Sequence, residues 1–220
     1  MGQSYTFRFY SPQPMLTTER AVHLLRGVSA QGFRISSYLL NSKVHHVEKS
    51  QTLEPMQIVA ADGTCAVSLV VFDPDGYTSF TLQTFAPEAH GAQASVSVDE
   101  DDFDPNPTLT ASRLLELAKA VNLHLPLHFG WGDHEFQIGH LEPRLRFDRI
   151  GALAWANLFG PEMVRRIGAE QLRALPIHQV QVFKQGVLCL LTPAPGQPLS
   201  AVQADQIEAQ WPGCMLPLGE

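Results

Sequence analysis

The segment from residue 124 to residue 140 is rich in histidine and carboxylate side chains, the ligands of zinc and iron sites. His124 and His128 are four residues apart, so their side chains would lie on the same face of a helix. Pro126 between them disfavours a helix. No HExxH motif supplies a general base. One hypothesis is a small metal-dependent hydrolase that uses His124, His128 and His134. We favour histidines that bond a loop to a sheet, and expect no metal and no cofactor.

Nucleophile and phosphate-binding motifs are missing from the sequence. No serine lies in a GxSxG motif, and the three cysteines form no CxxC pair. Cys65 and Cys189 lie in or beside apolar runs, which is typical of small core side chains. Gly130-Trp131-Gly132 lacks the third glycine of a dinucleotide fingerprint, so we expect a bend that lets Trp131 pack. These patterns favour a protein that is not an enzyme.

An acidic run surrounds one aromatic ring in the middle of the chain. It consists of Asp99, Glu100, Asp101, Asp102, Phe103 and Asp104. The run lacks the glycine and the distal glutamate of a calcium-binding loop, and Pro105 and Pro107 follow it, so we expect a solvated loop. Phe103 among carboxylates suits an interface anchor for a basic partner.

The elements that position these groups follow from the hydrophobic pattern. Alternating residues predict a first strand and stripes of period 3.6 predict two helices, at residues 5–9, 21–28 and 114–121. Short β-prone runs with turn residues, including Asp73-Pro74-Asp75-Gly76, fill the segment from 35 to 98. Two helical pieces separated at Gly160 are expected over residues 148–168, then a hairpin and a last helix. The order predicts the α+β class, a mainly antiparallel sheet with helices packed on it, as a single domain over residues 1–220.

Composition limits the kinds of partner that the chain can bind. The 220 residues are 45% hydrophobic, enough for a sizeable core. Fifteen Lys and Arg against 22 Asp and Glu leave a net charge of -7, which disfavours nucleic-acid binding by phosphate neutralisation and favours a basic protein partner. No window is long and apolar enough for a membrane span, and no secretory leader is apparent, so we expect a cytoplasmic protein without a membrane partner.

The C-terminal third carries a recognisable block. It reads Trp155-Ala156-Asn157-Leu158-Phe159-Gly160-Pro161-Glu162-Met163-Val164-Arg165-Arg166-Ile167-Gly168, followed by a hairpin with Gly186-Val187-Leu188 and by Thr192-Pro193-Ala194-Pro195. This block resembles the distal part of bacterial polymorphic-toxin immunity proteins, including those encoded beside type VI secretion effectors. The resemblance implies that Trp155 and Leu158 are core anchors, that Gly160 and Gly168 are helix boundaries, and that a preceding loop bears Trp131.

The resemblance also implies a function. It predicts an immunity protein that binds a cognate bacterial toxin and neutralises it by occluding the toxin's active site. Combined with the acidic charge, it predicts a toxin with a basic binding face, contacted at residues 99–104. The alternatives are the hydrolase described above and a scaffold that assembles through a sheet edge or its last helix.

Overall fold

The computed structural model of the chain describes residues 4–11, 17–40, 43–48, 58, 67–84, 94–103, 105–125, 127–135, 137, 149–211 and 213–215. The strands are β1 (Ser4–Tyr10), β2 (Arg34–Leu40), β3 (Lys43–His46), β4 (Ser68–Phe72), β5 (Ser79–Thr84), β6 (Ala94–Asp99), β7 (Phe129–His134), β8 (Arg149–Ile150), β9 (Ala156–Phe159), β10 (Gln179–Phe183), β11 (Gly186–Leu190) and β12 (Cys214–Met215). The helices are α1 (Thr18–Ala30), α2 (Glu100–Phe103), α3 (Pro107–His124), α5 (Pro161–Ile167), α6 (Ala169–Ala174) and α7 (Ala201–Gln210).

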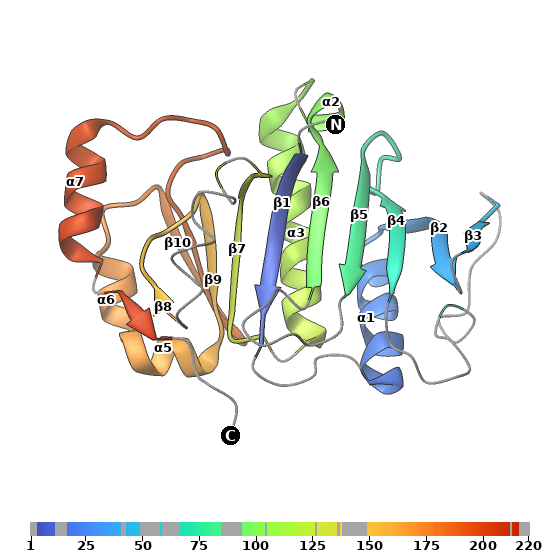
Figure 1. The fold of residues 1–220 in the computed structure, drawn as a ribbon, viewed down its shortest axis with the longest axis horizontal. Coiled ribbons are helices and arrows are strands. Elements are labelled where there is room, and N and C mark those ends of the chain that lie inside the picture. Colours follow the sequence, from blue (N-terminus) through green and yellow to red (C-terminus); the bar gives the residue numbers. More distant parts are fainter. Residues whose placement is uncertain are drawn as a thin grey trace.

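Ten of the described strands form one sheet, in the order β10-β11-β9-β7-β1-β6-β5-β4-β2-β3 (Figure 1). Every neighbouring pair in this sheet is antiparallel. The first strand of the chain therefore lies in the middle of the sheet, between β6 and β7. This arrangement confirms the predicted α+β class with a mainly antiparallel sheet.

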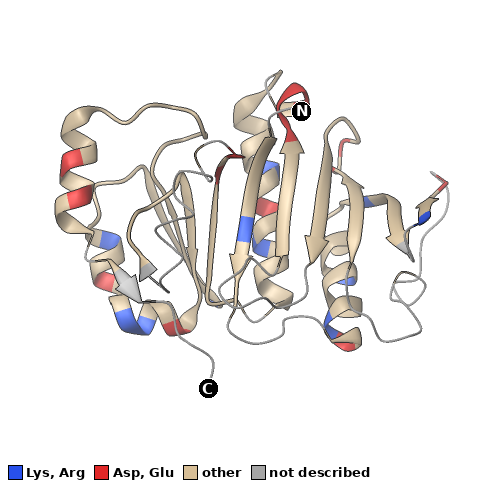
Figure 2. Ribbon diagram, in the orientation of Figure 1, with Lys and Arg blue, Asp and Glu red and all other residues tan. Residues whose placement is uncertain are grey.

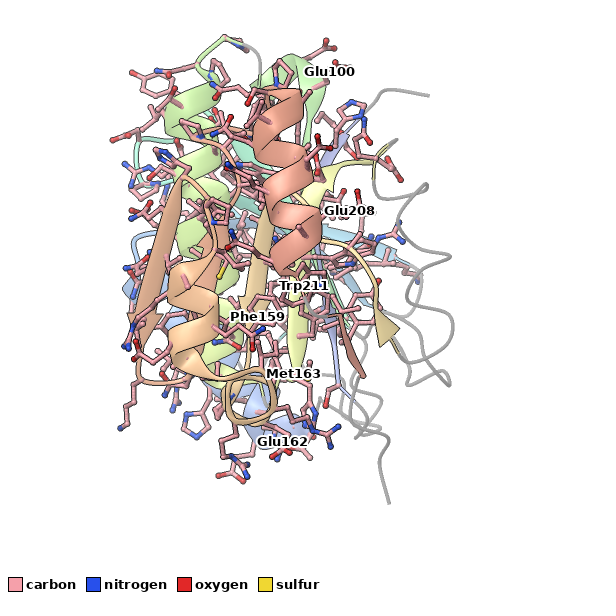
Figure 3. The ribbon with its side chains drawn as sticks, turned by 90° about the vertical axis from the view of Figure 1, so that its left-hand side faces the viewer. Glu100, Phe159, Glu162, Met163, Glu208 and Trp211 are labelled. Atoms are coloured by element: carbon pink, nitrogen blue, oxygen red, sulfur yellow. The ribbon has the colours of Figure 1, made fainter. Side chains whose placement is uncertain are left out.

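Helices cover the two faces of the sheet at different places. Phe7 and Phe9 lie in a large apolar cluster that includes buried residues of α1 and α3. Tyr10 joins a second cluster with residues of α5 and α6, because successive side chains of β1 point to opposite faces. Figure 3 shows Phe159, Met163 and Trp211 of this second cluster between the sheet and the C-terminal helices.

The local predictions with a strong period are confirmed. The predicted helices at residues 21–28 and 114–121 lie within α1 and α3. The predicted turn joins β4 to β5, and Gly76 has a φ of 79°, a conformation that glycine adopts without a steric penalty.

Two segments of the C-terminal half differ from their predictions. Residues 129–134, expected to be an irregular bend, form β7, because glycines there make room for the aromatic rings of β1. A Cβ at Gly130 would lie 2.8 Å from Phe7 Cε1, and one at Gly132 would lie 2.5 Å from Phe7 Cδ2. The helix expected before Gly160 is instead β9, whose four residues are all buried. Burial on both faces removes the alternation that identifies a strand.

Candidate functional site

Carboxylates from two parts of the chain, residues 99–102 and 133–135, meet where β6, β1 and β7 lie side by side. In the register of the sheet, Ser4 of β1 lies opposite Asp99, and Tyr5 lies opposite His134. The residues that follow β6 and those that end β7 therefore share one end of the sheet. We call this surface the acidic edge and define it as Asp99, Glu100, Asp101, Asp102, Asp133 and Glu135 (Figure 2).

Phe103 holds the acidic edge in place because its ring is packed in the core. Residues 100–103 form the short helix α2, not the expected solvated loop, and Phe103 is only 1% exposed. Its ring stacks on Tyr5 of the central strand with a centroid distance of 3.8 Å. The sequence predicts that Phe103 contacts a partner directly; in the structure its apolar surface is buried against β1. In this position the ring supports the carboxylates around it.

The carboxylates of the run differ in how they are held. Asp102 Oδ2 accepts hydrogen bonds from Ser79 Oγ at 2.7 Å and from Ser79 N at 3.3 Å, which ties α2 to the start of β5. Glu100 Oε1 lies 4.0 Å from His134 Nε2. Asp99 and Asp101 are exposed and Glu100 is half-buried, so these three can meet a partner. Asp104 lies outside the described residues, as does Cys65.

The Asp133 carboxylate links β7 to Trp155, the residue before β9, at this end of the sheet. Its Oδ1 accepts from His134 N at 2.8 Å, and its Oδ2 accepts from Trp155 N at 2.8 Å. Burial raises the pKa of the Asp133 carboxyl, although these two hydrogen bonds and the nearby His134 act in the opposite direction. Sequence reasoning missed this role, because the contact between Asp133 and Trp155 joins residues that no local pattern relates. Ser4 Oγ donates to Glu135 Oε2 at 2.8 Å, which adds a second link.

The three histidines of the hydrolase hypothesis do not come together. His124 ends α3 and packs on α1, so closely that a Cβ at Gly27 would lie 1.9 Å from its Nε2. His128 and His134 flank opposite ends of β7, roughly 20 Å apart for six strand residues. Within the described ranges, no group of three or more histidine, cysteine, aspartate or glutamate side chains could hold a metal ion. This geometry contradicts the hydrolase built on these three side chains.

The environments of His124 and His128 are those of packed side chains. Burial, and secondarily the neighbouring His23, lowers the pKa of His124. Burial also lowers the pKa of His128, and Glu162 opposes that effect. Both imidazoles are therefore stabilised in the neutral form, in agreement with a structural role.

The remaining residues singled out in the sequence lie in the scaffold. Trp131 is buried in β7 and its Nε1 donates to Tyr10 Oη at 3.0 Å. Trp155 is buried and its Nε1 donates to the Thr192 carbonyl at 3.0 Å. Gly160 precedes α5, and Gly168 follows it with a φ of 97°. These four residues lie in or next to β7, β9 and α5.

Comparison with known proteins gives a likeness in fold. No protein-family model matches the sequence, and no curated protein matches it. Among solved structures, the chain is similar to the Pseudomonas aeruginosa T6SS protein PA0821, with a TM-score of 0.54 and 12% sequence identity over 95% of this chain and 72% of that chain. At this identity the likeness shows the fold alone. Among the described helices, none is long and apolar enough to cross a membrane.

Proposed function

We propose that this chain is an immunity protein of a type VI secretion system, which binds a cognate toxin and covers the toxin's active site. Three features support the proposal. The fold is similar to that of a T6SS protein, the block from Trp155 to Gly168 resembles the distal part of toxin-immunity proteins, and the acidic edge is suited to a basic protein surface. The acidic edge is the observation that carries it.

The acidic edge is held in place before any partner arrives. Phe103 stacked on Tyr5 fixes one end of α2, and the Asp102 carboxylate bonded to Ser79 fixes the side of α2 that faces β5. A surface that is ordered in the free protein loses little conformational entropy on binding. Asp99, Glu100 and Asp101 therefore project from a rigid support.

Charge is distributed unevenly along the strands. Figure 3 places Glu100 and Glu162 at opposite ends of the molecule. At the end with Glu162, the helix α5 also carries Arg165 and Arg166, each of which forms an ion pair with Glu162. A basic toxin face is thus attracted to the end that bears the acidic edge, since complementary potentials orient and accelerate association.

Charge substitution on the acidic edge tests the proposal. The variant D99N/E100Q/D101N removes three negative charges from exposed or half-exposed positions and leaves Phe103 and Asp102 in place. We expect the association rate with the toxin to fall roughly tenfold at low ionic strength and its salt dependence to weaken. The measurement is surface-immobilised binding kinetics over a series of salt concentrations.

A matched control separates the acidic edge from net charge. The variant E170Q/D205N/E208Q removes the same number of charges from exposed positions on α6 and α7. The proposal predicts near-normal association for this control. Equal slowing of association in both triple variants would assign the effect to overall charge. An unchanged association rate for D99N/E100Q/D101N would show that the acidic edge is not part of the binding surface.

A further inference from the structure

The two lateral edges of the sheet differ in how they are protected from pairing with another strand. Figure 1 shows β3 at one end of the sheet and β10 at the other. Proteins protect edge strands with short length, charged side chains, proline or bulges. The edge strand β3 has four residues, begins at Lys43, and pairs with β2, whose register with β4 shifts between Ile35 and Ser37.

Of these devices, charged side chains, proline and bulges are absent from β10. Its five residues, Gln179, Val180, Gln181, Val182 and Phe183, include no charge and no proline. Its register with β11 runs without a shift from one end to the other. Among the described strands β10 pairs with β11 alone, and the Val182 side chain is 51% exposed. The outer side of β10 is a free strand edge with an exposed apolar side chain.

We infer that β10 pairs with β10 of a second copy of this chain, antiparallel about a two-fold axis at Gln181. In that register Gln181 lies opposite its own copy, Val180 lies opposite Val182, and Gln179 lies opposite Phe183. The same two valines therefore meet twice on one face of the joined sheet. A two-fold interface needs this kind of self-complementary surface.

The side chains on β10 favour pairing with a second copy of the chain. Val180 already packs against the second apolar cluster, so the Val180–Val182 pairs extend that cluster across the axis. On the other face, two opposed Gln181 amides can hydrogen-bond to each other. Each copy has a net charge of -7, but β10 carries no carboxylate, and the turn after it, Lys184-Gln185, adds none. The like-charged copies can thus approach at this edge.

This assembly is independent of toxin binding. The acidic edge lies where the strands β6 and β7 end, whereas β10 is a lateral edge of the sheet. Pairing through β10 joins two sheets side by side and leaves the acidic edge of each copy accessible.

Disulfide trapping tests the register. In a full-length background with Cys65→Ser and Cys214→Ser, Gln181→Cys places two thiols directly opposite each other. Opposed residues in an antiparallel pair have Cα atoms about 4.5 to 5.5 Å apart, within the range of a disulfide. Cys189 stays unreactive, since it is buried and burial raises its pKa to about 12. We expect a covalent dimer on non-reducing gels after mild oxidation.

A displaced cysteine is the matched control. Gln179→Cys lies opposite Phe183 of the second copy, and the two introduced cysteines are roughly 14 Å apart for a four-residue offset. We expect no covalent dimer from it. Cross-linking of Gln179→Cys as efficient as that of Gln181→Cys would overturn the proposed register.

Molar mass in solution tests the pairing itself. By light scattering, the wild type should have twice the mass of the 24.3 kDa chain, Val182→Lys should be monomeric, and Val44→Lys on the other edge strand should remain dimeric. A monomeric wild type at high micromolar concentration, or a dimeric Val182→Lys variant, would overturn the inference. If the wild type is monomeric and Val182→Lys impairs protection against the toxin, the outer side of β10 pairs with a strand of the toxin instead of a second copy.

Discussion

Replacing Phe103 by alanine distinguishes a scaffold role for this ring from a direct contact with a partner. The side chain is 1% exposed and stacks on Tyr5, so truncation removes a buried ring and leaves a cavity beside the central strand. Such truncations cost about 3 to 5 kcal/mol. We expect the unfolding free energy of Phe103→Ala to fall by about 3 kcal/mol, because α2 at the end of the sheet can partly collapse into the space. For a chain of this size the melting temperature should fall by roughly 6 to 12 °C.

Equilibrium urea unfolding, followed by tryptophan fluorescence, measures this loss. Phe103→Leu retains most of the apolar volume and should lose about 1 kcal/mol, within the range of volume-conserving core changes. Asp101→Ala, at an exposed neighbouring position, should change stability by no more than about 0.5 kcal/mol. A loss below about 1 kcal/mol for Phe103→Ala would refute the reasoning, since a stacked and buried ring cannot be removed at so small a cost.

Two further predictions concern backbone fit and pH, both measured by the same unfolding assay. A Cβ at Gly160 would lie 2.1 Å from the Leu127 carbonyl oxygen, so Gly160→Ala should destabilise by about 2 kcal/mol or more. Gly168→Ala has room for the methyl group, but with a φ of 97° and a ψ of 125° it should lose about 1 to 3 kcal/mol. A loss below about 1 kcal/mol for Gly160→Ala would contradict the close approach at Gly160. Burial raises the pKa of Asp133, so the folded chain retains this proton at pH values where the unfolded chain has lost it. The unfolding free energy of the wild type should therefore decrease, relative to Asp133→Asn, as the pH rises above the ordinary carboxyl range of about 4, and the opposite slope would contradict the assignment.

The hydrophobic period predicts those elements in which one face is buried and the other is solvated. The stripe in α1 is of this kind, and the helix occurs where the period places it. The strand predicted at residues 5–9 also occurs, although Thr6 and Tyr10 on its other face are buried as well. The pattern fails at β7 and β9. In β7 the glycines that accommodate Phe7 resemble turn residues, and in β9 all four residues are buried, so no alternation remains.

The acidic edge was only partly predictable for a related reason. The run from Asp99 to Asp102 is visible as a cluster of like charges in the sequence. That it meets Asp133 and Glu135 depends on the pairing of β1 with both β6 and β7, which is a long-range property of the sheet. The burial of Phe103 depends on the same pairing, because Tyr5 is the surface on which its ring stacks.

Capture of the partner tests the central claim most directly. The chain is immobilised, exposed to lysate of its own host, and washed at increasing salt concentration, alongside the D99N/E100Q/D101N and E170Q/D205N/E208Q variants. We expect one stoichiometric basic protein that is toxic when expressed without this chain. The wild type and E170Q/D205N/E208Q should retain it, and D99N/E100Q/D101N should lose it at a lower salt concentration. A partner retained equally by both triple variants, or a wild type that captures no such protein, would contradict the central claim.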